Sequence, residues 1–269
     1  MGVLHTLTVG PAEPTTAGDS PAVVFLHGLF GQGRNFMAIA KGLQPEFRSV
    51  LVDLPNHGRS GWTETVDLVA MADEVAEAVR AEVDARVHLV GHSLGGKVAM
   101  LLALRHPDLV ERLVVVDIAP GPSHDVSQFE HLLGSLATLD LAVLEGRAEA
   151  DEQLEQLIPN RTVRAFLLQN LHRTDRGWQW RANLDLLRSS LDVVGGFPEA
   201  GDSTFDGPVL WVVGERSEYT SQDDAARMRA LFPRAVRVAV KGAGHWVHSE
   251  QPDAFLATLR AFLPASLPQ

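Results

Sequence analysis

Six short apolar runs constrain this chain more than any other feature. They occupy residues 22–27, 49–54, 87–91, 113–118, 209–213 and 236–240. Runs that are apolar at nearly every position are typical of strands buried on both faces, as in a parallel sheet. Apolar residues at helical spacing mark the segments 67–83, 95–106, 221–231 and 251–263. This alternation predicts an open α/β sheet, mostly parallel, with helices on both of its faces.

One long segment, residues 121–205, interrupts the alternation and contains no strand-like run. Its spacing predicts four helices, at 129–139, 147–158, 162–170 and 183–193. A helical insertion between two strands of a parallel sheet is expected to cover the carboxyl edge of the sheet, where ligands bind. We therefore expect a core made of 1–119 and 206–269 and a helical cap, or lid, made of 120–205.

The composition excludes several classes of function. The chain has 269 residues with 23 Lys+Arg and 34 Asp+Glu, so its net charge is 23 − 34 = −11. That charge argues against a nucleic-acid partner and weakly favours neutral over anionic substrates. There is no Cys, which excludes disulfides, thiolate metal sites and a Cys nucleophile. The histidines lack recognisable metal-ligand spacing, so we expect neither a metal nor another cofactor.

We expect neither a signal peptide nor a membrane-spanning segment. The first residues lack a basic stretch followed by a long apolar run, as a signal peptide would have. No stretch reaches the roughly 18–20 apolar residues that span a bilayer. We expect a cytoplasmic protein, monomer or homodimer, that acts on a small molecule.

The pentapeptide Gly91-His92-Ser93-Leu94-Gly95 matches the pattern Gly-x-Ser-x-Gly. It follows the apolar run at 87–90 directly and opens the next helical segment, which is the placement of a nucleophile elbow. Such a turn strains the serine backbone, and the two glycines leave room for the neighbouring strand and helix. We predict that Ser93 is a nucleophile; the alternative is a tight strand–helix turn without chemistry.

A serine nucleophile needs a general base within hydrogen-bonding reach. Of the 11 histidines, His245 is the best placed, because Gly242-Ala243-Gly244-His245-Trp246 lies between the last strand and the last helix. Small residues there leave a loop able to reach the elbow. His248 is the nearest competitor, with a structural role expected, and His92 and His27 are expected to pack rather than to act as bases.

The acid that orients the histidine is the least determined member of the set. The slot that usually holds it, in the loop after the strand that follows a lid, contains Ser217 with Glu215 and Glu218 close by. Asp117 lies at the end of the apolar strand that comes one strand earlier in the chain. A buried carboxylate needs a hydrogen-bonding or charged partner. We favour Asp117 and keep Glu218 and Glu215 as alternatives.

The loop after the first buried run has the sequence His27-Gly28-Leu29-Phe30-Gly31. It can supply the backbone N–H of Leu29 to a tetrahedral oxyanion, and Leu94, the residue after the nucleophile, can supply a second donor. Substrate pockets have mostly apolar walls. As pocket residues we predict Phe30, Trp180, Tyr219 and Trp246.

Four motifs of this chain, in order and at the expected intervals, resemble the α/β-hydrolase superfamily: HGLFGQGRNF, DLPNHGRS, GHSLGGKVAM and GAGHWVHSE. Together with VVVDIAP, they look most like small bacterial esterases related to the abhydrolase-domain 11 proteins. The resemblance implies a Ser–His pair whose acid follows the sixth strand, which matches Asp117 and explains Ser217. It also implies hydrolysis of carboxylic esters or thioesters with short acyl chains.

These observations predict a serine hydrolase that cleaves small carboxylic esters or thioesters through a Ser93–His245–Asp117 triad and an acyl-enzyme. Other chemistries of the same fold are alternatives, namely a cofactor-free haloperoxidase, a lactonase or a C–C hydrolase. A hydrolase-like protein that only binds a small molecule is the alternative from a different class.

Overall fold

The computed structural model describes residues 3–10, 21–122, 126–221 and 223–264. Within them a seven-stranded sheet has the order β1-β3-β2-β4-β5-β8-β9. Only β1 runs antiparallel to its neighbour among these seven described strands, which confirms the predicted, mostly parallel α/β sheet. The strands are β1 (Thr6–Val9), β2 (Ala22–Leu26), β3 (Arg48–Val52), β4 (Val87–His92), β5 (Val110–Val116), β8 (Val209–Gly214) and β9 (Ala235–Val240).

Helices cover both faces of the sheet, as the alternation predicts. Successive residues of a buried strand point to opposite faces, so Phe25 and Leu26 belong to two different hydrophobic clusters. The Phe25 face is covered by α1 (Met37–Gly42) and α11 (Pro252–Phe262), preceded in the chain by η1 (Gly33–Phe36) and α10 (Val247–Glu250). The Leu26 face is covered by α2 (Leu68–Glu82), α3 (Leu94–Arg105) and α9 (Asp224–Leu231).

The prediction that every apolar run is buried on both faces is wrong for the last one. Strand β9 lies at the edge of the sheet. Most of its residues are half-buried or exposed, and Val236 is 59% exposed. Because an edge strand has one neighbour, its apolar side chains lack the cover that the central strands receive, and sequence alone does not distinguish the two positions.

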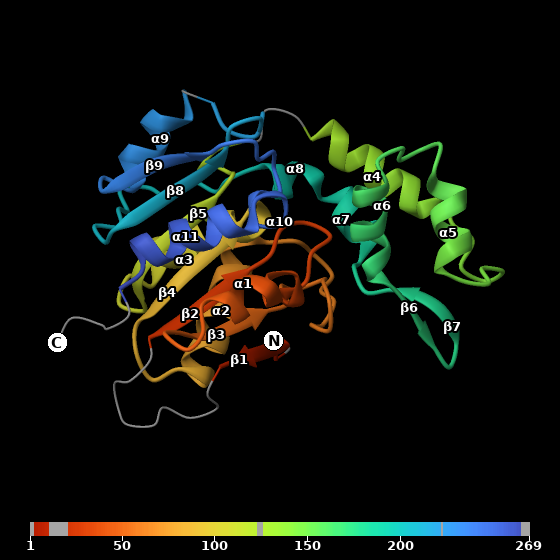
Figure 1. Cartoon of the computed structure of the whole chain (residues 1–269), viewed down its shortest axis with the longest axis horizontal. Coiled ribbons are helices and arrows are strands. Elements are labelled where there is room, and N and C mark those ends of the chain that lie inside the picture. The colour runs from red at the N-terminus through yellow and green to blue at the C-terminus, as the bar shows by residue number, and fades with distance from the viewer. Residues whose placement is uncertain (1–2, 11–20, 123–125, 222, 265–269) are drawn as a thin grey trace.

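Between β5 and β8 lies the cap, which stands to one side of the sheet in Figure 1. Its elements are α4 (Ser127–Ala137), α5 (Arg147–Leu154), α6 (Arg161–Leu167), η2 (Leu168–Asn170), β6 (Leu171–Thr174), β7 (Gly177–Trp180), α7 (Leu184–Ser189) and α8 (Leu191–Gly195). The prediction of an all-helical cap is therefore wrong at one place. The strands β6 and β7 form an antiparallel hairpin, and the helix expected at 183–193 is two helices that meet at Ser190.

The hairpin forms around a short turn. Leu171 pairs with Trp180 and Thr174 with Gly177, which leaves two residues at the tip. Gly177 has φ +102°, a conformation that glycine adopts without the clash a side chain would cause. The strands are four residues each and carry polar residues between the apolar ones, so they lack the continuous apolar pattern that marks the core strands.

Several hydrogen bonds between described residues join the cap to loops of the core. The side chain of Asn170 donates to the carbonyl of Phe30 at 2.7 Å. The backbone N–H of Asn183 donates to Asn56 O at 3.0 Å. Trp62 Nε1 donates to the carbonyl of Arg181 at 3.2 Å. The residues flanking the hairpin are therefore held against the loops that follow β2 and β3.

None of the helices in the described part of the chain is long and apolar enough to cross a membrane.

Candidate active site

Ser93 occupies the single residue between β4 and α3. Its backbone has φ +51° and ψ −118°, a region that a non-glycine residue occupies only under strain. The turn stays in the sheet's hydrogen-bond pattern, because Ser93 N–H donates to Val116 O at 3.0 Å. The serine is 5% exposed. A strained serine at the N-terminus of a buried helix is the arrangement of a nucleophile elbow.

The two glycines of the pentapeptide allow the helix to approach this closely. A Cβ atom on Gly91 would lie 2.2 Å from the carbonyl oxygen of Gly95, inside the helix. A Cβ atom on Gly95 would lie 2.4 Å from the carbonyl oxygen of Leu26, on the neighbouring strand. The clashes expected from the sequence are therefore present at both positions, and each is with backbone, which has little freedom to move.

Asp117 follows β5, the strand next to β4, and is fully buried. Its Oδ2 lies 2.8 Å from Nδ1 of His245. Its Oδ1 accepts a hydrogen bond from the backbone N–H of Gly214 at 2.9 Å. The hydroxyl of Ser217 donates to Oδ2 as well. A buried carboxylate is costly unless hydrogen-bonded, and these donors satisfy it.

The structure does not bring either glutamate to the histidine. Glu215 is exposed and accepts a hydrogen bond from the backbone N–H of Gly242 at 2.8 Å. Glu218 is also exposed, and within the described residues no contact joins it to His245. Of the three candidate acids, the geometry therefore favours Asp117.

The ring of His245 is held between aromatic neighbours. Tyr219 stacks on it with 3.9 Å between ring centroids and 27° between planes. The hydroxyl of Tyr219 donates to Gln128 Oε1 at 2.7 Å. Phe129 meets the imidazole edge-on at 6.4 Å. Together these contacts restrict the ring to one orientation.

His92 ties the elbow to the loop of His245. Its Nε2 lies 2.9 Å from the carbonyl oxygen of His245, to which it donates, and the two rings are 4.7 Å apart. Burial first, and then the nearby charges of His245 and His248, hold the pKa of His92 well below its ordinary value. A neutral, buried His92 fits the packing role expected from the sequence.

His27 and His248 are also buried. Nε2 of His27 accepts the N–H of Leu54 at 3.0 Å, and burial lowers its pKa. Burial and the charge of His245 lower the pKa of His248 to about 3. Its ring packs on Phe36 at 4.5 Å, and its Nδ1 has no hydrogen-bond partner in the described part of the chain. Both residues fit structural roles.

Two backbone N–H groups beside Ser93 stand without an acceptor among the hydrogen bonds of the described residues. One belongs to Leu94, the first residue of α3, where a helix leaves its N–H groups unsatisfied. The other belongs to Leu29 in the loop after β2. Both residues are buried and line the same small cavity as Ser93.

That cavity has a volume of about 10 Å³, roughly the space of one water molecule. Its walls are mostly apolar, and the described residues that line it besides Ser93 are Leu29, Leu94, Lys97, Ile118, Phe129, Val194 and Gly195. It lies where α3 meets α4 and α8 of the cap.

None of the four residues predicted for a substrate pocket, Phe30, Trp180, Trp246 and Tyr219, lines this cavity; their role in a substrate pocket stays a prediction. Phe30 is buried behind the wall, with its ring 6.3 Å from that of Phe129.

The other three predicted pocket residues have different neighbours. Tyr219 packs on the ring of His245. Trp246 borders a surface pocket that it shares with Phe166, with their rings 6.2 Å apart. Trp180 lies on the cap hairpin, in a third pocket.

Sequence reasoning missed the part played by Lys97. This side chain is 1% exposed, and its Nζ donates to the carbonyls of Gly195 and of Gly196, the latter at 2.8 Å. Burial lowers its pKa to about 7. A lysine inside an otherwise apolar helical segment is the signal that could have marked it. Its bonds fix the end of α8, and with it one wall of the cavity.

Within the described residues no group of three or more His, Asp or Glu side chains could hold a metal ion.

Comparison with known proteins places this geometry in a family. The alpha/beta hydrolase fold family matches residues 21–252. The chain belongs to the α/β-hydrolase fold family. It is 39% identical over 249 residues to the sn-1-specific diacylglycerol lipase ABHD11 of Mus musculus, with 90% of this chain and 81% of that protein covered. It is 31% identical over 245 residues to esterase YbfF of Escherichia coli, with 91% and 93% covered.

A solved structure of an esterase has the same fold as this chain. The structure described as a marine microorganism esterase superposes with a TM-score of 0.92 at 32% identity. It covers 98% of this chain, and this chain covers all of it. The present α/β hydrolase is therefore a hydrolytic enzyme, and its relatives carry the names of esterases and lipases.

The depressed pKa of His248 predicts loss of stability in acid. The unfolded chain binds a proton at this residue near pH 6.5 and the folded chain near pH 3, so the unfolded state holds more protons between these values. Stability therefore falls as the pH decreases through this window, by at most about 1.4 kcal/mol per pH unit for one group.

Replacing His248 by Phe keeps a ring against Phe36 and removes this titration. Urea unfolding at pH 7 and pH 5 should show a smaller pH-dependent loss of the free energy of unfolding in His248→Phe than in the unaltered protein, by up to about 2 kcal/mol. His131→Gln, at an exposed position, is the control and should keep the original pH dependence. An unchanged dependence in His248→Phe would contradict the assignment.

Proposed function

We propose that this α/β hydrolase is a serine esterase that cleaves small carboxylic esters through an acyl-enzyme on Ser93. The observation that carries the proposal is the strained turn that holds Ser93 beside two backbone N–H groups without acceptors, those of Leu29 and Leu94. Donors fixed in this way have no use in the folded chain by itself, but they match the oxygen of a tetrahedral intermediate.

In the first half of the reaction, His245 removes the proton from the hydroxyl of Ser93. The serine oxygen forms a bond to the ester carbonyl carbon, and the carbonyl electron pair moves onto its oxygen. The N–H groups of Leu29 and Leu94 stabilise that oxyanion; one such donor contributes about 2.7–4 kcal/mol in a protease where it was removed. When the intermediate collapses, the bond to the alcohol oxygen breaks and His245 returns the proton to the leaving alcohol.

In the second half, a water molecule attacks the acyl group on Ser93. His245 takes a proton from the water, the new oxyanion uses the same two donors, and the serine oxygen leaves with the proton from His245. The product is the free acid, and the enzyme returns to its starting state. No cofactor takes part in either half.

Asp117 acts on the histidine and not on the substrate. Its Oδ2 lies 2.8 Å from Nδ1 of His245, so it holds the tautomer in which Nε2 is free to accept a proton. It also stabilises the imidazolium that forms during each half-reaction. The donors from Gly214 and Ser217 keep this carboxylate in place.

The small cavity beside Ser93 supports a preference for short acyl groups. A volume of about 10 Å³ with mostly apolar walls holds little more than the methyl end of an acetyl group.

The cytoplasmic location, the choice between monomer and homodimer and the division into a core and a cap at 120–205 stay predictions.

The roles of the nucleophile and the acid are tested by the hydrolysis of p-nitrophenyl acetate. Ser93→Ala should abolish turnover above background. Asp117→Asn should lower kcat by about 10³–10⁴-fold, as loss of a correctly oriented histidine does in other serine hydrolases. Glu215→Gln and Glu218→Gln are matched controls that remove the same charge nearby and should keep nearly full activity.

Full activity of Asp117→Asn would exclude Asp117 as the acid. Full activity of Ser93→Ala would exclude the acyl-enzyme. A fluorophosphonate probe separates a hydrolase from a binding protein, because a protein without a reactive serine would leave Ser93 unlabelled.

Acyl preference is tested with p-nitrophenyl esters of increasing chain length. We expect kcat/KM to be highest for acetate and to fall steadily toward octanoate. Val194→Ala enlarges the cavity, and should shift the preference toward longer chains by about 10-fold, since one or two methylenes in an apolar pocket change kcat/KM by 10–200-fold. Val193→Ala, at the 38% exposed neighbour on α8, should not. A preference for long chains would overturn the proposal.

A further inference from the structure

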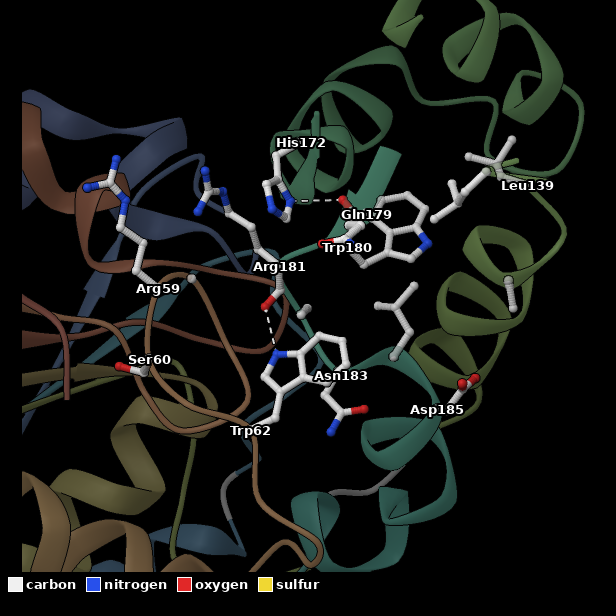
Figure 2. A pocket seen from close by; sticks show the side chains of 15 residues that line it. Arg59, Ser60, Trp62, Leu139, His172, Gln179, Trp180, Arg181, Asn183 and Asp185 are labelled. Carbon is white, nitrogen blue, oxygen red and sulfur yellow. Dashed lines mark hydrogen bonds between the residues drawn. The ribbon is translucent and has the colours of Figure 1, made fainter. Parts of the chain in front are cut away.

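A second, larger pocket lies between the cap hairpin and the loop that follows β3. It has a volume of about 630 Å³ and is lined by residues of that loop, of both hairpin strands, of the start of α7 and of the segment from Ala137 at the end of α4 to Leu141. Within the described residues, it shares no lining residue with the cavity beside Ser93. We call it the hairpin pocket; Figure 2 shows it from close by.

One end of the hairpin pocket is cationic. In Figure 2 the guanidinium groups of Arg59 and Arg181 lie on the same side and point away from the indole rings, and the ring of His172 lies beside Arg181. Arg34 joins Arg59 and Arg181 around an adjoining cleft. Partial burial, and then the charge of Arg59, lower the pKa of Arg181, while the charge of Asp53 raises it and that of Arg34 lowers it. These like charges have therefore gathered at a cost to one another.

Nearby carboxylates compensate this cluster only in part, through the charge of Asp53. Within the described residues, no acidic oxygen comes within 4.0 Å of the guanidinium of Arg59 or Arg181. Asp53, the nearest buried acid, is already committed to the backbone N–H of Gly33 at 2.7 Å and of Arg59 at 2.9 Å, and to the ring of His5 at 3.0 Å. Asp185 lines the pocket at the end away from the arginines (Figure 2).

Two indole rings line the pocket beside the cationic end. Trp62 is 56% exposed, although its Nε1 is fixed by a hydrogen bond to the carbonyl of Arg181. Trp180, on β7, is half-buried. An exposed large aromatic ring forgoes the stabilisation that burial provides, and a ring held in place offers a flat surface for stacking.

We propose that the hairpin pocket binds a nucleoside phosphate or a similar phosphate-bearing ligand with a planar ring. Arg59 and Arg181 receive the phosphate groups, because a guanidinium matches phosphate oxygens with paired N–H donors. The indoles of Trp62 and Trp180 receive the ring by stacking. A phosphate group that carries more than one negative charge is a better ligand for two neighbouring arginines than a carboxylate, which carries only one. The site is separate from ester hydrolysis and does not depend on that proposal.

The test is isothermal titration calorimetry on the full chain, with ADP, pyrophosphate and adenosine as probes. We expect ADP and pyrophosphate to bind, ADP the more tightly, and adenosine alone to bind at least tenfold more weakly than ADP. Binding should weaken as salt is raised, because the arginines are partly exposed. Arg59→Gln and Arg181→Gln should each weaken ADP binding by about tenfold or more.

Arg176→Gln is the matched control. This arginine is exposed at the tip of the same hairpin and lies outside the pocket lining, so its replacement removes one positive charge and should leave ADP binding unchanged. Arg59 is exposed as well, so a thermal unfolding curve like that of the unaltered protein is expected for Arg59→Gln. This variant carries the test if Arg181→Gln does not fold.

Several results would overturn the proposal. These are no heat of binding with ADP and pyrophosphate, equal loss in Arg176→Gln and Arg59→Gln, or adenosine binding as tightly as ADP. Equal affinity for pyrophosphate and ADP would overturn the stacking role of Trp62 and Trp180. Ser93→Ala should bind ADP normally and Arg59→Gln should hydrolyse p-nitrophenyl acetate normally, so failure here is distinguishable from failure of the esterase proposal.

Discussion

Backbone strain at the carboxyl ends of the central strands is the constraint on which the rest of this structure depends. Among the described residues, four that are not glycine have positive φ: Phe30, Asn56, Ser93 and Asp117. They follow β2, β3, β4 and β5, which lie side by side in the sheet. Each such conformation costs about 1–3 kcal/mol. The core of buried strands and flanking helices holds these turns, and the candidate active site is built on them.

Hydrogen bonds to neighbouring strands also hold the turn residues in place. The N–H of Ser93 donates to Val116 O on β5, and the N–H of Asp117 donates to Val212 O on β8 at 2.8 Å. Each turn residue therefore extends the pairing of its strand by one step. The register that aligns β4, β5 and β8 thereby fixes where the candidate nucleophile and acid lie relative to one another.

The sequence was sufficient to predict the features that depend on local pattern. Continuous apolar runs identify the central strands, and the two glycines flanking Ser93 identify the elbow, because both signals are local and steric. The exposure of β9 was not predictable, since an edge position is a property of the whole sheet. The β6–β7 hairpin was not predicted, because its strands are short and carry alternating polar residues. The sequence favoured Asp117 as the acid but left Glu218 and Glu215 open, because their distances from His245 depend on the geometry of neighbouring loops.

The net charge of the chain is another sequence property that does not predict local chemistry. A net charge of −11 favours neutral ligands as an average over the surface, but Arg59 and Arg181 gather at one end of the hairpin pocket, with Arg34 in the adjoining cleft. Likewise, Ser217 stands where an acid is usual and instead donates to Asp117. In both places the distribution of groups in space, and not their number in the sequence, decides the chemistry.

The central claim is that Ser93 carries the acyl group during turnover. It is tested most directly by mixing the enzyme with p-nitrophenyl acetate, quenching in acid before the steady state and mapping the peptides by mass spectrometry. The account predicts an acetyl group on the peptide that contains Ser93, and none there in Ser93→Ala. Turnover with no covalent adduct, or with the acetyl group on another residue, would contradict it.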